Sequence, residues 1–249
     1  MTDSQTWLPQ LIEVAEPLHA DWVSMRRYLH QNPELSDSEY QTTEYLTCAF
    51  TKLGLPTHIP VDKRGLTADL VTFKHDPNRW IAIRGDIDAL PISDSKAVDY
   101  RSTCDGVMHA CGHDVHATVV VAAMQILTAM HKANRLPWPI AVRAILQPSE
   151  ELATGARYMI HHHALRDIDA ILALHVDPTR SVGCIGLRHG TLTAACDAIH
   201  VTITGNGGHG ARPHLTNDPI DAITHWVQSA FRRLGRTVNA HQTVVFSVG

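Results

Sequence analysis

Length, composition and charge describe an ordinary globular chain and exclude several classes of protein. The 249 residues are 44% hydrophobic and 18% charged, and the formal net charge is −4. The chain can therefore bury a core, but it has no basic run for binding nucleic acid or an anionic membrane surface. Its longest apolar run, 119–127, is too short to span a bilayer. The acidic N-terminal segment predicts a helix rather than a signal peptide, so we expect a cytoplasmic protein.

The N-terminal part of the chain predicts two helices, at 7–30 and 38–53. Pro33 lies between them and marks the end of the first helix. Ser36 and Glu39 have the spacing of a capping box, in which each side chain accepts a hydrogen bond from the other residue's backbone N–H. We therefore expect these two side chains to close the first turn of the second helix.

From residue 66 the pattern changes to short runs rich in β-branched and aliphatic residues. These runs predict four strands, with helices between them. The predicted strands span 67–73, 80–88, 140–148 and 170–176, and the predicted helices span 114–132 and 153–166. Strands that alternate with helices are typical of an α/β domain, so we expect a mostly parallel sheet flanked by helices.

The last quarter of the chain predicts a different unit. Residues 196–205 alternate apolar and polar side chains as a half-exposed strand does, and 241–249 begins a second strand. A glycine-rich loop and an amphipathic helix from Asp218 lie between them. These elements do not complete a domain. We therefore expect a first domain at 1–186 and an incomplete α+β domain at 187–249.

Nine residues, MHACGHDVH at 108–116, hold one cysteine and three histidines. The chain has five cysteines, an odd number at irregular spacing, which argues against a disulfide framework. Cys111 and His113 flank Gly112 just before a predicted helix, and a tight turn there lets both side chains face one ion. A helix N-terminus also favours the thiolate, which predicts a lowered pKa for Cys111. The alternative is a buried cysteine beside a histidine that caps the helix.

Other polar residues follow the predicted strands at equivalent places. In open α/β sheets the functional crevice lies at the carboxyl ends of the strands, where helix N-termini also point. We therefore expect one cluster at this edge of the sheet, made of Asp86, Asp88, Cys111, His113, Glu150, Glu151 and His175. Thiolate, imidazole and carboxylate together suit zinc or a similar divalent ion, which favours a metal site.

The carboxylates of this cluster admit more than one role. Of the adjacent pair Glu150 and Glu151, one would bind a metal and the other would act as general base on water. The alternative for this pair is an acidic first turn of a helix. Asp86 and Asp88 either ligate, orient a histidine, or cap a strand-end turn. We expect His116 to support the site rather than to ligate.

The glycine-rich loop GGHGARP contains two further candidates. Glycines on both sides of His209 are typical of a loop that moves. His209 could hydrogen-bond an oxyanion as such a lid closes, and Arg212 could bind a substrate carboxylate. The alternative for His209 is an ordinary histidine of a surface loop.

Segments throughout the chain resemble those of one known family. They are RRYLHQNPELSDSEYQT (26–42), RGDIDALPISD (84–94), GVMHACGHDVHATVVVAAMQIL (106–127), LQPSEELATGARYMI (146–160), LALHV (172–176) and GNGGHGARPHLTNDPI (205–220). These segments are similar to those of the amidohydrolases of the aminoacylase and carboxypeptidase G type. The branch they resemble most contains hippurate hydrolases, bacterial N-acyl-amino-acid amidohydrolases and plant auxin-conjugate hydrolases.

The resemblance implies a hydrolase that cleaves the amide bond of N-acyl amino acids with two divalent metal ions, Zn²⁺ or Mn²⁺. By the matching motifs Glu150 would be the catalytic acid and base. The same motifs assign four metal ligands: Cys111, His113, Glu151 and His175. His209 would belong to a lid domain that is inserted in the α/β catalytic domain, and would approach the substrate carbonyl. Since the lid is also the usual dimerisation surface, the resemblance implies a possible homodimer.

Relatives in this family continue well past residue 249, complete the lid and supply one more histidine ligand. We therefore expect the chain to be truncated within the lid. Two other functions stay open. A metal-free thiol hydrolase would use Cys111 as nucleophile with His113 or His175 as base, although Glu150 and Glu151 would then have no role. An inactive fragment would act at most as a binding or dimerising module.

Overall fold

A computed structural model of the chain describes residues 7–72, 79–190, 192, 197–239, 241–242 and 244–248. The chain divides into two compact units, one ending at Arg180 and the other beginning at Ser181. The roles expected for 1–186 and 187–249 stay predictions. Phe73 at the end of one predicted strand and Cys196 at the start of another lie outside the described residues.

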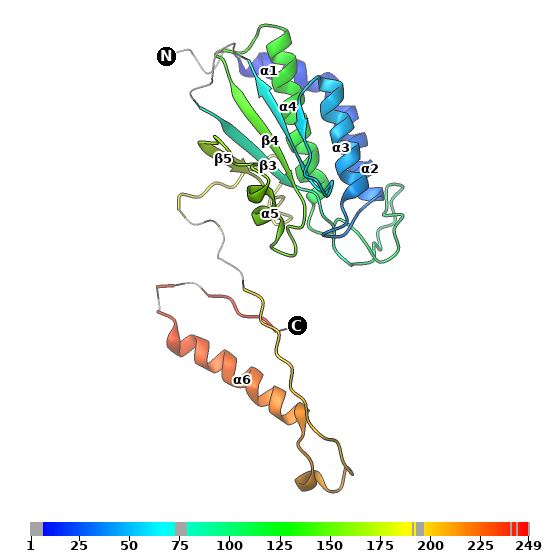
Figure 1. Cartoon of the computed structure of the whole chain (residues 1–249), viewed down its shortest axis with the longest axis vertical. Helices are drawn as coiled ribbons and strands as arrows, with labels where there is room; N and C mark the ends of the chain where they lie inside the picture. The colour runs from blue at the N-terminus through cyan, green and yellow to red at the C-terminus, as the bar shows by residue number, and fades with distance from the viewer. Residues whose placement is uncertain are drawn as a thin grey trace. The chain divides into compact units, whose positions relative to one another are not determined.

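The first unit is built on a five-stranded sheet with the order β1-β2-β4-β3-β5 (Figure 1). The strands are β1 (Thr57–His58), β2 (Leu66–Val71), β3 (Ile81–Asp86), β4 (Ala141–Gln147) and β5 (Ala170–Ala173). β3 lies between β4 and β5 and is parallel to both, whereas β1 and β2 form the antiparallel side. The predicted α/β class is confirmed, and the strands that precede the site residues are the parallel ones.

Most helices of this unit cover one face of the sheet (Figure 1). They are α1 (Leu8–Ala15), the 3₁₀ turn η1 (Glu16–Leu18), α2 (His19–Gln31), α3 (Tyr40–Leu53) and α4 (His113–Lys132). The first predicted helix is therefore interrupted, because Pro17 lacks the N–H that a continuous helix needs. α5 (Gly155–His161) packs on the opposite face and is shorter than predicted.

The core shows why apolar residues of β4 face both sides of the sheet. The residues of β4 alternate between two clusters, because successive side chains of a strand point to opposite faces. Ala144 and Leu146 pack in the large cluster with Met124 of α4, whereas Ile145 packs with Met159 of α5 on the other face. A strand that is covered on both sides contains a near-continuous apolar run rather than an alternating pattern.

The predicted capping box at the start of α3 is wrong. Glu39 does occupy the N-cap position, but its side chain makes no capping hydrogen bond. The first-turn amides of α3 donate instead to the Glu34 carboxylate. The backbone turns at Asp37, where φ is 66°, and this turn aims the Ser36 and Glu39 side chains away from the helix and toward the loops that follow the strands.

Among its described residues, which leave out Cys196, Thr243 and Gly249 of the predicted strands, the second unit contains the predicted helix but neither strand. The 3₁₀ turn η2 (Pro213–Leu215) precedes α6 (Pro219–Thr237), and the Asp218 side chain caps α6 by accepting from the amides of its first turn. The described residues of 197–205 and 241–248 form no ladder, and the sole pairing assigned in this part is a bridge between Asn206 and Asn217. A strand forms only where a neighbouring strand takes its hydrogen bonds, so the alternating pattern alone was not sufficient.

In the part of the chain that the structure describes, no helix combines the length and the apolar character needed to cross a membrane.

The packing of α4 on the sheet predicts a large cost for truncating its central residue. Met124 is fully buried in the main cluster, so Met124→Ala should lower the free energy of unfolding by about 2–5 kcal/mol through lost burial and the cavity left behind. Val119→Ala on the same helix is the control, because Val119 is 37% exposed. Urea unfolding followed by circular dichroism measures both, and equal costs would contradict the assigned core.

Candidate metal centre

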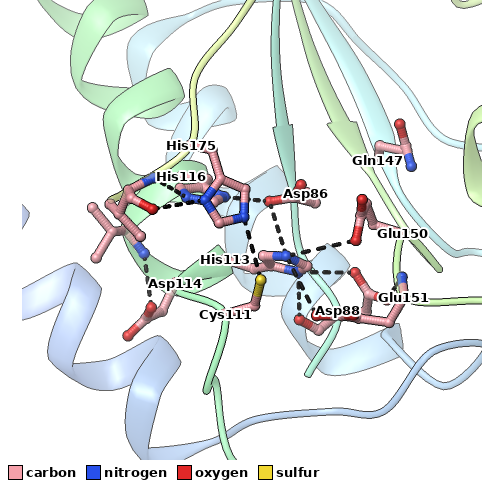
Figure 2. Close-up of polar contacts among 12 residues, drawn as sticks. Asp86, Asp88, Cys111, His113, Asp114, His116, Gln147, Glu150, Glu151 and His175 are labelled. Atoms are coloured by element: carbon pink, nitrogen blue, oxygen red, sulfur yellow. Dashed lines mark hydrogen bonds and ion pairs between the residues drawn. The ribbon is translucent and has the colours of Figure 1, made fainter. Parts of the chain in front are cut away.

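The predicted cluster forms at the carboxyl edge of the parallel strands. β3 ends at Asp86 opposite Gln147 of β4, so the segments that follow these two strands leave the sheet side by side. α4 begins at the same edge, and His175 follows β5 (Figure 2). The expected residues are brought together here: Asp86, Asp88, Cys111, His113, Glu150, Glu151 and His175.

Among the described residues, three groups of donor atoms share His113, and within each group one donor atom from every residue lies within 4.8 Å of the others. The first is Cys111, His113 and His175, the second is His113, Glu150 and Glu151, and the third joins His113 to Asp86 and His116. The Cys111 Sγ lies 3.2 Å from His175 Nε2. His113 Nε2 lies 3.9 Å from Glu150 Oε2 and 3.8 Å from Glu151 Oε1. These separations are too long for hydrogen bonds between His113 and the glutamates.

Two buried atoms of this cluster have no hydrogen-bond partner among the described residues. They are His113 Nε2 and Glu151 Oε1, which face each other across the cluster. A buried polar atom without a partner is costly, and native structures supply a protein group, a water or an ion. Imidazole, thiolate and carboxylate are the donor set of zinc and similar ions, so the residues present fit a divalent cation.

Gly112 brings Cys111 and His113 to the same side. It is the N-cap residue of α4, and its φ of 89° is a left-handed conformation that other residues adopt at a cost. A Cβ at this position would also lie 2.4 Å from the Val176 side chain. Both observations require glycine between the two ligand candidates, and Val176 ties this turn to the segment that carries His175.

Asp88 fixes the orientation of His113. The Nδ1 of His113 lies 2.9 Å from the Asp88 carbonyl and 3.1 Å from its Oδ1, so Nδ1–H donates there and the Nε2 lone pair faces the cluster. The other Asp88 oxygen accepts from the Glu151 amide at 3.0 Å and from the Ser36 hydroxyl at 2.7 Å. Because both carboxylate oxygens of Asp88 already accept hydrogen bonds, Asp88 fits the orienting role rather than the ligand role.

Asp86 and His116 form a second supporting pair. His116 Nδ1–H donates to Asp86 at 2.6 Å, while its Nε2 accepts from the Val176 amide at 2.9 Å. Both ring nitrogens are therefore used, in agreement with the expected supporting role. Burial opposes ionisation of Asp86, but the His116 hydrogen bond and the nearby Arg84 charge lower its pKa to about 2. Asp86 is thus a fixed negative charge beneath the cluster.

The expectation of a lowered Cys111 pKa is wrong. Burial comes first among the causes and the Glu151 carboxylate second, and together they raise the pKa of the Cys111 thiol to about 12. The dipole of α4 is outweighed because several carboxylates surround the thiol. Burial and the Asp86 charge likewise raise the pKa of Glu150. An excess of anionic groups of this kind is stable only with a cation, and it disfavours a free thiolate nucleophile.

His209 and Arg212 belong to the second unit, and their predicted roles stay predictions. Both are exposed. The Ala211 amide donates to His209 Nδ1 at 3.2 Å, which leaves the proton of His209 on Nε2 and free to donate. The Arg212 amide donates to the His209 carbonyl at 2.8 Å, so the two side chains share one turn.

Two residues outside the predicted cluster, Ser36 and Glu39, also hold the site in place. Ser36 donates to Asp88, and Glu39 accepts from the Ser149 amide at 2.7 Å, next to Glu150. Because Ser36 and Glu39 have the spacing of a capping box, the sequence pattern predicted that they cap α3 rather than that they bond Asp88 and Ser149. The sequence contained no signal for this role, because the full burial of Glu39 is visible only in the structure.

Comparison with known proteins gives one consistent result. Residues 82–247 match the family model described as peptidase family M20/M25/M40. The N-acetyl-L-cysteine deacetylase of Bacillus subtilis is 37% identical over 232 residues, which are 93% of this chain and 54% of that protein. The N-acetyldiaminopimelate deacetylase of Ligilactobacillus salivarius is 36% identical over 91% of this chain and 58% of its own.

A solved structure agrees with these relatives. The YXEP protein of Bacillus subtilis, described as a dinuclear metal binding peptidase from the M20 family, is 35% identical with a TM-score of 0.64. The match covers 70% of this chain and 48% of that one. The chain thus spans little more than half the length of the curated relatives it matches.

The donor geometry predicts that Cys111→Ala weakens metal binding. Losing a ligand should lower the affinity for Co²⁺ by more than about tenfold, since residues outside the ligand set already cost about 10–100-fold. Cys104→Ala is the matched control, because Cys104 is an exposed cysteine of the preceding loop. Titration followed by visible absorption measures both variants. Equal affinities would return Cys111 to the role of a buried structural thiol.

The raised Cys111 pKa predicts a pH dependence of the same binding. The thiol is protonated at neutral pH and must lose its proton to ligate, so metal binding releases a proton and affinity rises with pH. The proton released by Cys111 alone makes the affinity rise by about tenfold per pH unit. In Cys111→Ala this contribution is missing, so the affinity should rise less steeply with pH than in the wild type. Co²⁺ affinity of the wild type and of Cys111→Ala between pH 6 and 8 tests this, and identical slopes would contradict it.

Proposed function

The chain belongs to peptidase family M20/M25/M40, and from that membership we propose that it hydrolyses the amide bond of small N-acyl amino acids with the aid of divalent metal ions. The observation that carries the proposal is the shared donor cluster, in which His113 Nε2 and Glu151 Oε1 are buried without a partner among the residues described. Two relatives whose names describe deacetylases of N-acetyl amino acids support the substrate class.

We place two divalent ions, Zn²⁺ or Mn²⁺, at this cluster. The residues that would hold them are Cys111, His113, Glu151 and His175. The YXEP protein, described as dinuclear, supports the number. When bound, such ions polarise a carbonyl and make water a better nucleophile at neutral pH. They would also neutralise the carboxylates that otherwise raise the pKa of Cys111.

Glu150 is the residue suited to proton transfer. It lies at the edge of the cluster with a side chain that is 40% exposed, so water can reach it. Burial and the Asp86 charge raise its pKa, which brings the carboxyl nearer to the range useful for exchanging protons. In the proposed reaction the Glu150 carboxylate takes a proton from the attacking water and passes it to the nitrogen of the leaving amino acid.

The second unit would supply the remaining contacts. His209, whose Nε2–H is free to donate, would hydrogen-bond the oxyanion that forms at the scissile carbonyl, a contact typically worth about 2.7–4 kcal/mol in the transition state. Arg212 in the same turn would bind the carboxylate of the substrate. We also propose a cytoplasmic location and a homodimer formed through 187–249, on the strength of the family resemblance.

The thiol-hydrolase alternative is disfavoured by the charges around Cys111. Its Sγ does lie 3.2 Å from His175 Nε2, a geometry that a thiol–imidazole pair requires. A nucleophilic cysteine, however, sits in an electropositive environment, whereas Glu150 and Glu151 surround this one and raise its pKa. The same convergence of ligand candidates on one buried histidine favours an enzyme over a passive binding module.

The proposal predicts that Glu150→Gln keeps the metal and loses turnover. The amide cannot accept the water proton, so kcat for an N-acetyl amino acid such as N-acetyl-L-cysteine should fall by about 10²–10⁴-fold, with Co²⁺ affinity within threefold of wild type. Glu44→Gln, on an exposed position of α3, is the control. A chelator should abolish the wild-type activity. Retained turnover in Glu150→Gln would overturn the role of Glu150, and activity that survives the chelator would support the thiol mechanism.

A further inference from the structure

A polar segment between α2 and α3 reaches the site from outside. Glu39 at its end is fully buried, and its Oε1 accepts the Ser149 backbone N–H at 2.7 Å. Ser149 directly precedes the glutamate pair of the cluster. A fully buried glutamate is uncommon, because burying its charge is costly unless hydrogen bonds or an opposite charge compensate it.

Ser149 is the residue at which the chain changes direction after β4. Its φ is 49°, a left-handed conformation that is unfavourable for a residue with a Cβ, and it is 1% exposed. The Ser149 carbonyl accepts from the amides of Thr154 at 3.3 Å and Gly155 at 3.0 Å. Gly155 approaches so closely that a Cβ there would lie 1.5 Å from the Pro148 carbonyl oxygen. Both backbone groups of Ser149 are therefore held.

The direction of this turn decides where Glu150 and Glu151 point. With Ser149 left-handed, the next two side chains face His113, at 3.9 and 3.8 Å from its Nε2 (Figure 2). If Ser149 relaxed to an ordinary conformation, both carboxylates would turn away together. A hydrogen bond to the Ser149 amide, made by a residue outside the cluster, therefore affects the direction of both Glu150 and Glu151.

The neighbours of Glu39 strengthen the same support. The Ser149 hydroxyl donates to Asp37 at 2.9 Å and accepts from the Asp37 amide at 3.0 Å. Arg64 forms an ion pair with Asp37. Ser36 donates to Asp88, whose same oxygen accepts the Glu151 amide. The segment 36–39 therefore contacts the loop directly at Ser149, before Glu150, and is linked to Glu151, after it, through Asp88.

We propose that Glu39 is a positioning residue, which acts through the amide of Ser149 to aim Glu150 and Glu151 and so sets the metal affinity of the centre. Its effect on turnover rests on the proposed function, whereas its effect on metal binding does not. Glu39 acts by placing its acceptor oxygen Oε1 at the Ser149 amide, and its negative charge is not required. The other oxygen, Oε2, has no hydrogen-bond partner within the described ranges.

Two substitutions of Glu39 distinguish the position of its acceptor oxygen from its negative charge. Glu39→Gln keeps an acceptor at the same distance and removes the charge, whereas Glu39→Asp keeps the charge and withdraws the oxygen by one methylene from the Ser149 amide. Thr42→Val is the matched control, because Thr42 is buried on the same helix and its hydroxyl has no partner among the residues described. Urea unfolding and near-ultraviolet circular dichroism establish that each variant is folded.

The measurement is Co²⁺ affinity of the full chain, by visible absorption in competition with a chelator of known affinity. Glu39→Asp should bind Co²⁺ about 10–100-fold more weakly, the range for residues that orient ligands, while Glu39→Gln and Thr42→Val stay within threefold of wild type. For hydrolysis of an N-acetyl amino acid, Glu39→Asp should lower kcat by at least tenfold with KM within threefold, because the reacting groups are displaced and the substrate contacts are not.

The outcomes separate this inference from the proposed function. Wild-type Co²⁺ affinity in Glu39→Asp, or a tenfold loss in Glu39→Gln, would overturn it. If Glu39→Asp does not fold, Glu39→Ala takes its place as the variant without the acceptor: a tenfold or larger loss of Co²⁺ affinity supports the inference, and wild-type affinity overturns it. A wild-type chain that binds Co²⁺ but hydrolyses nothing would refute the proposed function and leave the metal-affinity arm intact. A wild-type chain that binds no Co²⁺ would overturn the metal centre and this inference with it.

Discussion

The site depends on the parallel pairing of β3 with β4 and β5. Because these strands run in the same direction and Asp86 pairs with Gln147, the polar segments that follow them leave the sheet at one edge and one level. α4 begins at this edge, and Gly112 turns two donor side chains toward it. A single register shift would turn alternate strand residues to the opposite face and scatter the cluster. The donor residues therefore come together only because β3, β4 and β5 pair in this register.

The four carboxylates at this edge divide into two kinds. Asp86 and Asp88 have their charges met by donors: His116 and Arg84 for the first, and His113 with the Glu151 amide for the second. Glu150 and Glu151 have no such compensation, and His113 Nε2 between them accepts nothing. Hydrogen bonds and ion pairs thus compensate the charges of Asp86 and Asp88, whereas the charges of Glu150 and Glu151 repel each other. This arrangement stores repulsion that a cation relieves, which couples metal binding to stability.

The parallel strands and the cluster were predictable because each depended on a local pattern with a fixed geometric outcome. Apolar runs indicated strands, and the position of Asp86, Glu151 and His175 just after them indicated the edge. The predictions of a capping box at Ser36 and Glu39 and of a strand at 196–205 failed. In both cases the residues have the expected local pattern, but the structure they form depends on which other residues they hydrogen-bond. Ser36 and Glu39 bond residues far along the chain, and no strand lies beside 197–205 among the residues that the structure describes. Long-range partners are the information that a local pattern lacks.

The hydrogen bond between Glu39 and the Ser149 amide joins residues 110 positions apart. Closing a loop of this length has an entropic cost, so the bond depends on the packing that holds both ends in place. Glu39 is the N-cap residue of α3, and α3 packs in the main core cluster through Leu46 and Phe50. A change that loosens α3 therefore also loosens the loop that carries Glu150 and Glu151, although α3 contributes no residue to the donor cluster.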